Sequence, residues 1–280
     1  STGETSIVID LPEAQPKLLV QARREDQDSP KFQGSKTNVG FDTGTNSISL
    51  AGLGNFDDIT DFDTENSIDD IGGVSATGTY LFNETLDLGA VYSLDLRKII
   101  QTDSVYSSDL IDSVTDIDAR QDFDGTASVD TNAEVFVQTS QDATSYSDFQ
   151  KFANGTFKGR AFKFKCVLTT QDTNQDIRVS QLGYFAEFQR RTEQSTTTIA
   201  SGAGAKSITF DHQFFTGTSA LLGANSNPPA IGITALNMAS GDFFELSSIT
   251  GTGFTVHFKN SSGSSIDRNF NFTATGFGKG

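Results

Sequence analysis

The stretch GFTVHFKNSSGSSIDRNFNFTAT, residues 253–275, decides the fold class of this chain. In its first part Phe254, Val256 and Phe258 alternate with polar side chains, and residues 266–274 continue the same alternation after the Gly-containing segment 260–265. A period of two on both sides of a turn is typical of strands with one buried face. The stretch therefore predicts a half-buried antiparallel hairpin.

The rest of the chain supports an all-β fold. Alternating segments such as SITFDHQFF and AIGITALNM predict further strands, and no segment has convincing apolar spacing for an amphipathic helix. Gly, Ser, Thr, Asn and Asp dominate the connections, and 24 Phe residues supply much of the core material. We expect an all-β protein of two antiparallel β-sandwiches of jelly-roll type in tandem, after an N-terminal connecting segment.

Charge divides the chain into regions. The formal net charge is −16, yet residues 194–280 hold four basic and four acidic residues, so the excess lies before them. We expect a strand or connector at 1–33, an acidic sandwich at 34–193 and a small sandwich at 194–280, with a Ser/Thr/Gly-rich linker near 194–205. The carboxylate-rich runs 57–70 and 103–130 read as solvated loops.

The acidic balance also excludes some partners. A chain of pI near 4.4 lacks the basic footprint that nucleic acid or an anionic membrane would require, so we expect neither partner. No apolar stretch is long enough to span a bilayer. Membrane insertion is therefore not expected.

The single cysteine indicates a core thiol. Cys166 shares one face of an alternating run with Phe162, Phe164 and Leu168, which favours burial over a nucleophilic role. One Cys and the two His of the chain do not supply a structural zinc site. We expect no metal and no cofactor.

Catalytic motifs are missing from the sequence. It has no G-x-S-x-G, no H-E-x-x-H and no phosphate-binding Gly loop. Asp172, Asn174 and Asp176 have the opening spacing of a calcium loop, but Ile177 and Gly183 replace its Gly and Glu, so a turn held by Asx side chains is expected. A glycosidase carboxylate pair stays open, because such a pair is defined by separation in space.

Candidate ligand-binding residues are few. Asp211, His212 and His257 are the weak candidates for a shallow site at strand ends, each more readily explained as a surface residue. We expect no catalytic residue.

Two stretches resemble modules of bacteriophage tails. GDFFELSSITGTGFTVHFKNSSGSSIDRNFNFTATGFGK resembles the small terminal β-sandwich of many tail and fibre proteins, which is similar in pattern to the H-type lectin sandwich. AEVFVQTSQDATSYSDFQKFANGTFKGRAFKFKCVLTTQDTNQDIRVSQLGYFAEFQRR resembles the jelly roll near the C-terminus of tail tip attachment (host-specificity) proteins, itself similar to discoidin-type galactose-binding sandwiches. The resemblance covers about residues 30–280.

The resemblance implies roles for particular segments. AEVFVQTSQD would be one strand with its turn, YSDFQKF a short segment after it, and GRAFKFKCVLTT a central strand. Arg160 is then expected to cap loop carbonyls or to pair with an Asp. Lys163 and Lys165 would point away from the Phe162 face, into solvent or under an acidic loop.

The function that the resemblance implies is structural and adhesive. We expect a non-catalytic, extracellular virion component of a tail tip or tail fibre, which contacts other tail proteins and a host receptor, with a glycan as one candidate. A tail depolymerase is the alternative, although the chain lacks the short repeats of a β-helix. A purely structural spacer is a third reading, and fold analogy does not separate it from the first.

Adjacent phenylalanines predict association between copies. Phe243 and Phe244, like Phe214 and Phe215, would face opposite ways in a strand, so one of each pair would lie outside a single core. Exposed aromatic side chains mark contact surfaces. We therefore expect a closed homo-oligomer, a trimer, as the axis of a phage tail implies.

Overall fold

The computed structural model describes residues 18–20, 32–52, 73–106, 131–173, 175–217 and 227–279. Every regular element in these ranges is a β-strand, and the all-β prediction is confirmed. None of the described residues forms a helix that could cross a membrane. The chain divides into two compact units, a first unit (Gln21–Ala186 and Gly217–Asn225) and a C-terminal unit (Ser1–Val20, Glu187–Thr216 and Ser226–Gly280).

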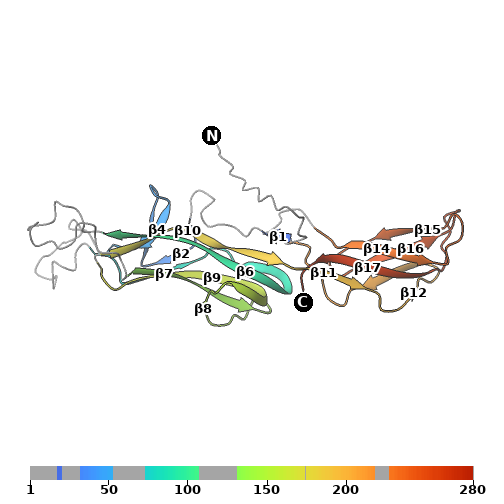
Figure 1. Ribbon diagram of the computed structural model, residues 1–280, viewed down its shortest axis with the longest axis horizontal. Helices are drawn as coiled ribbons and strands as arrows, with labels where there is room; N and C mark the ends of the chain where they lie inside the picture. Colours follow the sequence, from blue (N-terminus) through green and yellow to red (C-terminus); the bar gives the residue numbers. More distant parts are fainter. Residues whose placement is uncertain are drawn as a thin grey trace, which may run out of the picture. The chain divides into compact units, whose positions relative to one another are not determined.

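Strands of the first unit belong to one hydrogen-bonded sheet (Figure 1). Its main path runs in the order β2-β5-β9-β6-β10-β4-β3, while β7 pairs with β8 and β9. The bounds are β2 (Ser35–Thr37), β3 (Val39–Asp42), β4 (Ser47–Leu50), β5 (Thr77–Leu81), β6 (Leu86–Tyr106), β7 (Thr131–Ser140), β8 (Gln150–Lys151), β9 (Gly155–Thr170) and β10 (Gln175–Phe188); a short β1 (Leu18–Val20) precedes them.

Strand β9 is central, as predicted. It pairs with β7 through residues 161–170 on one edge, and with β6 and then β5 on the other edge. Its inward-facing residues Phe162, Phe164, Cys166 and Leu168 are buried. The period of two in the sequence predicted this buried face, because successive side chains of a strand point to opposite sides.

Aromatic rings fill the core of the first unit. Phe164 of β9 stacks on Tyr184 of β10 with ring centroids 4.2 Å apart, and Phe82 and Phe152 contact the Phe164 ring. Tyr80 is fully buried, and its hydroxyl accepts a hydrogen bond of 2.9 Å from the backbone N–H of Gly34. A buried Tyr needs such a partner for its polar end.

Strands of the C-terminal unit form two separate sheets (Figure 1). The four-stranded sheet contains β11 (Arg190–Gln194), β12 (Ile199–Ala200), β14 (Ala230–Leu236) and β17 (Asn269–Phe277). The three-stranded sheet has the order β13-β16-β15, with β13 (Ala205–Thr209), β15 (Phe243–Ser247) and β16 (Gly253–Lys259).

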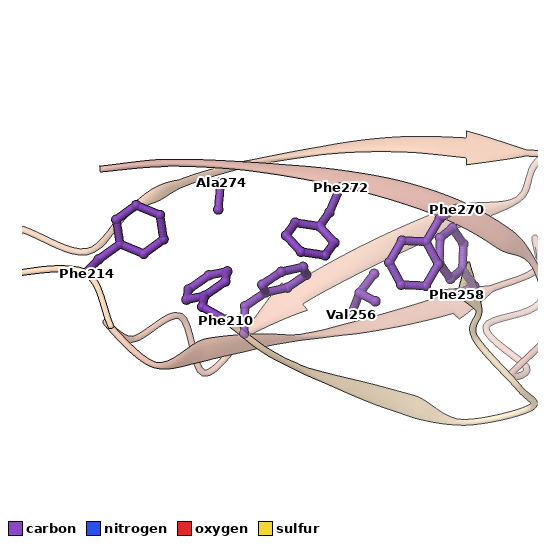
Figure 2. Packing of buried hydrophobic residues seen from close by; sticks show 8 residues of the cluster. Phe210, Phe214, Val256, Phe258, Phe270, Phe272 and Ala274 are labelled. Atoms are coloured by element: carbon purple, nitrogen blue, oxygen red, sulfur yellow. The ribbon is translucent and has the colours of Figure 1, made fainter. Parts of the chain in front are cut away.

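The predicted hairpin at 253–275 is therefore wrong. Its two strands are β16 and β17, which lie in different sheets, and the isolated bridge between Lys259 and Ser265 joins β16 to the segment before β17. Apolar and polar side chains alternate in both strands because both strands face the same core, one from each side. Figure 2 shows Phe270 and Phe272 of β17 directed toward Val256, Phe258 and neighbouring side chains of the other sheet.

Several boundaries differ from the sequence expectations. The main part of the C-terminal unit begins at Glu187, and residues 190–194 form β11, every residue of which pairs with β17. The Ser/Thr/Gly-rich segment after it carries β12 and the start of β13, so it contributes strands rather than a free linker. The acidic run 57–70 lies outside the described residues, as do most of 103–130 and residues 1–17.

The two phenylalanine pairs behave differently. Phe214 and Phe215 are both buried, which contradicts the expectation that one of them faces outward. Residues 211–214 are not in a strand, so Phe214 enters the sandwich core while Phe215 stacks on Phe188 at 4.1 Å. In β15, Phe243 is 40% exposed and Phe244 is 37% exposed.

Candidate functional site

Asp211, His212 and His257 are not brought together by the fold. His257 lies in β16 opposite Ala205, whereas the other end of β13, Thr209, lies opposite Gly253. Asp211 and His212 follow that far end and are exposed. Four residues of strand rise separate the two ends by about 13 Å. These three residues therefore do not form one site.

Each of the three has local contacts. His257 Nε2 lies 2.8 Å from Ser265 Oγ. The backbone N–H of Asp211 donates to Glu193 Oε1 at 2.7 Å, and the backbone carbonyl of His212 accepts a hydrogen bond from Arg191. The contacts at residues 211 and 212 hold the turn before Phe214.

Arg191 and Glu193 fasten this end of the sandwich. Arg191 Nη1 lies 2.9 Å from Glu193 Oε2, and Arg191 Nε donates to the carbonyl of Gly278 at 2.7 Å. The guanidinium carbon lies 3.7 Å from the centroid of the Phe214 ring, a cation–π contact. The side chains of Arg191 and Glu193 are only 16% and 13% exposed. The pair is therefore structural, and the guanidinium donors of Arg191 are not available to a ligand.

The neighbouring Arg190 lies on the other face of β11. An open pocket of about 300 Å³ adjoins it on the C-terminal unit, lined by Arg190, Asn227, Pro228, Ala230, Thr275, Gly276 and Phe277. The strand register places Arg190 opposite Phe277, and Ala230 opposite Thr275. No described residue forms a hydrogen bond or ion pair with the Arg190 side chain. Sequence reasoning missed this pocket, because it read Arg190 as part of the region leading into a linker.

Arg160 in the first unit has the role expected of it. Its Nε and Nη2 lie 3.0 and 3.2 Å from the two carboxylate oxygens of Asp87, and its Nη1 donates to the carbonyl of Asp142 at 3.4 Å. The hydrogen bonds from Arg160 lower the pKa of Asp87. Backbone N–H groups of Ser145 and Thr144 lower the pKa of Asp142. The expected pairing with an Asp and with a loop carbonyl is confirmed.

Lys163 and Lys165 are covered by aromatic side chains. Lys163 Nζ lies 4.1 Å from the Tyr146 ring centroid, and Lys165 Nζ lies 4.5 Å from that of Phe149. Both lysines are half-buried. Aromatic side chains of the segment that follows β7 therefore cover the Lys163 and Lys165 face of β9 through cation–π contacts. The sequence had predicted solvent or an acidic loop at this face.

Cys166 is a core thiol, as expected. It is fully buried, and burial raises its pKa to about 12, so the thiolate is not available as a nucleophile near neutral pH.

The turn at 172–176 is tied to β4. Asp176 Oδ1 accepts the N–H groups of Leu50 at 3.0 Å and of Ile177 at 2.7 Å. Asp172 accepts a side-chain hydrogen bond from Gln175, whereas Asn174 lies outside the described residues. Within the described ranges, no three His, Cys, Asp or Glu side chains are grouped as metal ligands would be.

Comparison of the whole chain with known protein families, curated proteins and solved structures gives no significant match.

Proposed function

We propose that this chain is a non-catalytic component of a bacteriophage tail tip or tail fibre that contacts the host cell surface. The observation that carries the proposal is the open pocket beside Arg190, on the outer face of the four-stranded sheet. The resemblance of residues 133–191 and 241–279 to tail modules points in the same direction. A glycan is the receptor class that such a shallow polar surface suits.

The surface around the pocket supports binding rather than catalysis. Alternate residues of β11 and β17 present hydroxyl and amide groups there, and Thr192 Oγ1 lies 3.3 Å from Thr275 Oγ1. Binding sites need a few well-placed polar groups beside apolar walls. Acid–base catalysis needs in addition a titratable group within reach of the reacting atoms, and the residues that line this pocket include no carboxylate and no histidine.

The proposed partners are other tail proteins, a host receptor and two further copies of the chain. Strand β15 is an edge strand of the three-stranded sheet, and it carries the partly exposed Phe243, with Ile249 shortly after it. An exposed edge with aromatic side chains favours association unless it is covered. Phe243 lies opposite Lys259 on the outer face, whereas Phe244 lies opposite the buried Phe258. Phe243 is therefore the better residue for testing the trimer.

Sedimentation velocity of the full chain tests the proposed trimer. The wild-type chain should sediment as a trimer, and Phe243→Asp should shift it toward the monomer because a charge would then lie in the contact. Thr234→Asp, an exposed position in β14, serves as the control and should leave the mass unchanged. A wild-type monomer at micromolar concentration would rule out this assembly.

Antibody labelling tests the place of the chain in the virion. Antibodies raised against the chain should label the tail end of the phage particles that encode it, and their Fab fragments should block adsorption to host cells. Labelling of the capsid, or tail labelling without any effect on adsorption, would contradict host contact.

A further inference from the structure

We propose that the pocket beside Arg190 binds the carboxylate-bearing ring of an acidic sugar, a uronic acid or a sugar acid of similar size. This inference rests on the proposed host-contact function and names the ligand class of that site. Three features carry it: an arginine without a hydrogen-bond or ion-pair partner among the described residues, a mixed apolar and polar lining, and a stretch, residues 187–280, without net formal charge.

The contrast between two adjacent arginines identifies the anion-binding group. Arg191 uses its guanidinium on Glu193, on two backbone carbonyls and on the Phe214 ring. Arg190 has no hydrogen-bond or ion-pair partner among the described residues, and it lines the pocket. A guanidinium presents paired donors whose geometry matches a carboxylate. Arg190 is therefore the group that a ligand carboxylate would bind.

The remaining lining suits a sugar ring. Phe277, Pro228 and Ala230 supply apolar surface, while Asn227 and Thr275 supply an amide and a hydroxyl. A pyranose has both a C–H face that packs on an aromatic ring and hydroxyls that need hydrogen-bond partners. The volume of about 300 Å³ lies at the lower end of the range for small-molecule sites. One ring, rather than an extended chain, is the unit that fits.

The charge balance of residues 187–280 permits an anionic ligand. Residues 187–280 contain six basic and six acidic residues, so the net charge of −16 belongs to residues 1–186. Of the six acidic residues, Glu193 is paired with Arg191, Asp242 with Arg268 and Glu245 with Lys259. None of the six lines the pocket. Arg190 is thus the one charged side chain that lines it.

Strand pairing removes the backbone mode by which a peptide C-terminus or a phosphate is commonly bound. Those anions are commonly bound by runs of free backbone N–H groups. Here Thr275 and Phe277 lie in β17, which pairs with β11 on one side and with β14 on the other, and the carbonyl of Phe277 accepts from Phe215. The backbone around the pocket is engaged in the sheet, and recognition falls to side chains.

A matched pair of sugars tests the proposal. Methyl β-D-glucuronide and methyl β-D-glucoside differ in whether C6 is a carboxylate or a hydroxymethyl group. Each would be titrated into the ¹⁵N-labelled full chain, with the amide shifts of Thr275 and Phe277 as the readout. The glucuronide should bind at least about tenfold more tightly, because a charge-assisted bond to Arg190 forms with the carboxylate alone.

Variants assign the effect to Arg190. Arg190→Gln should abolish the preference for the glucuronide. Arg190→Lys should keep part of it, because lysine retains the positive charge but lacks the paired planar donors of a guanidinium. Lys158→Gln removes one positive charge from an exposed position in the first unit and should change nothing.

The outcomes that overturn the proposal are distinct. Equal binding of the two sugars, an unchanged preference in Arg190→Gln, or shifts confined to other residues would each reject the site. Acetate binding as tightly as the glucuronide would reject the sugar ring, and tighter binding of a peptide with a free C-terminus would reject the ligand class. The comparison of the two sugars with the wild-type chain needs no variant to fold. Host contact is tested separately by antibody block of adsorption.

Discussion

The two units bury similar side chains but distribute charge and strand pairing differently. In the first unit, β2 to β10 belong to one sheet, and the sequence up to residue 186 carries the whole negative charge. In the C-terminal unit, two short sheets face each other across a cluster of phenylalanines, and basic and acidic residues are equal in number over residues 187–280. The comparison shows that the negative charge excess of the chain lies outside residues 187–280, the stretch that holds the Arg190 pocket.

Arginines show the same contrast at the level of single residues. Arg160 of the first unit is held by Asp87, and Arg191 of the C-terminal unit is held by Glu193. Both fasten loops to strands. Arg190, adjacent to Arg191 but on the opposite face of β11, has no hydrogen-bond or ion-pair partner among the described residues.

Core truncations should give the largest effects and should show whether the units unfold separately. Phe272→Ala removes a ring from the C-terminal core, and Phe164→Ala removes one from the first unit. Each should destabilise its own unit by about 3–5 kcal/mol. Thermal unfolding followed by amide NMR signals of each unit measures this. Simultaneous loss of both sets of signals in both variants would contradict separate units.

Close packing around Gly276 should give an intermediate effect. A Cβ at this position would lie 2.6 Å from Phe214 Cδ1 and 3.1 Å from Pro229 Cβ, so Gly276→Ala forces the core ring to move. We expect a loss of about 1–3 kcal/mol in the C-terminal unit. Gly232→Ala in the neighbouring strand β14 is the control, because its nearest atom is 3.8 Å away. Equal stability of the two variants would reject tight packing at Gly276.

A half-buried carboxylate in the first unit should give the smallest effect. Burial raises the pKa of Asp176, so the folded state takes up a proton more readily than the unfolded chain. Its ionisation is therefore unfavourable for folding at neutral pH, and that penalty falls as the pH is lowered through the raised pKa toward 3.8.

The variant Asp176→Asn removes this titration but keeps the oxygen that accepts from Leu50 and Ile177. The melting temperature of the first unit should be unchanged or higher at pH 7, with the difference from wild type shrinking on acidification. Asp148→Asn, at an exposed position, should have no effect. A clear drop in melting temperature for Asp176→Asn would contradict the assigned sign.

The period of two in the sequence predicted which face of a strand is buried but not which sheet the strand belongs to. The alternation in 162–168, 254–258 and 270–274 identified buried side chains correctly, because a period of two depends only on local strand geometry. It could not assign β16 and β17 to different sheets, since both faces of a sandwich core produce the same pattern. The separate placement of the Phe214 and Phe215 rings depends on the non-strand segment 211–214, which a period of two in the sequence does not predict.

The pocket could not be predicted from the sequence, for a related reason. Its lining comes from three segments about 40 residues or more apart, around Arg190, Ala230 and Phe277, which only the register of β11, β14 and β17 brings together. Arg190 and Arg191 look alike in sequence, and the face of the strand decides which of them is paired. Chain composition near residue 194 indicated a linker, because Ser and Thr are common both in linkers and on exposed strand faces.

The central claim is that the chain binds a host surface polysaccharide without cleaving it. The most direct measurement exposes the full chain to an array of bacterial surface polysaccharides and assays released reducing ends in the same samples. We expect saturable binding to at least one acidic polysaccharide, with reducing ends at the level of a heat-denatured control. Reducing ends above that control, or a folded chain that binds no polysaccharide on the array, would contradict it.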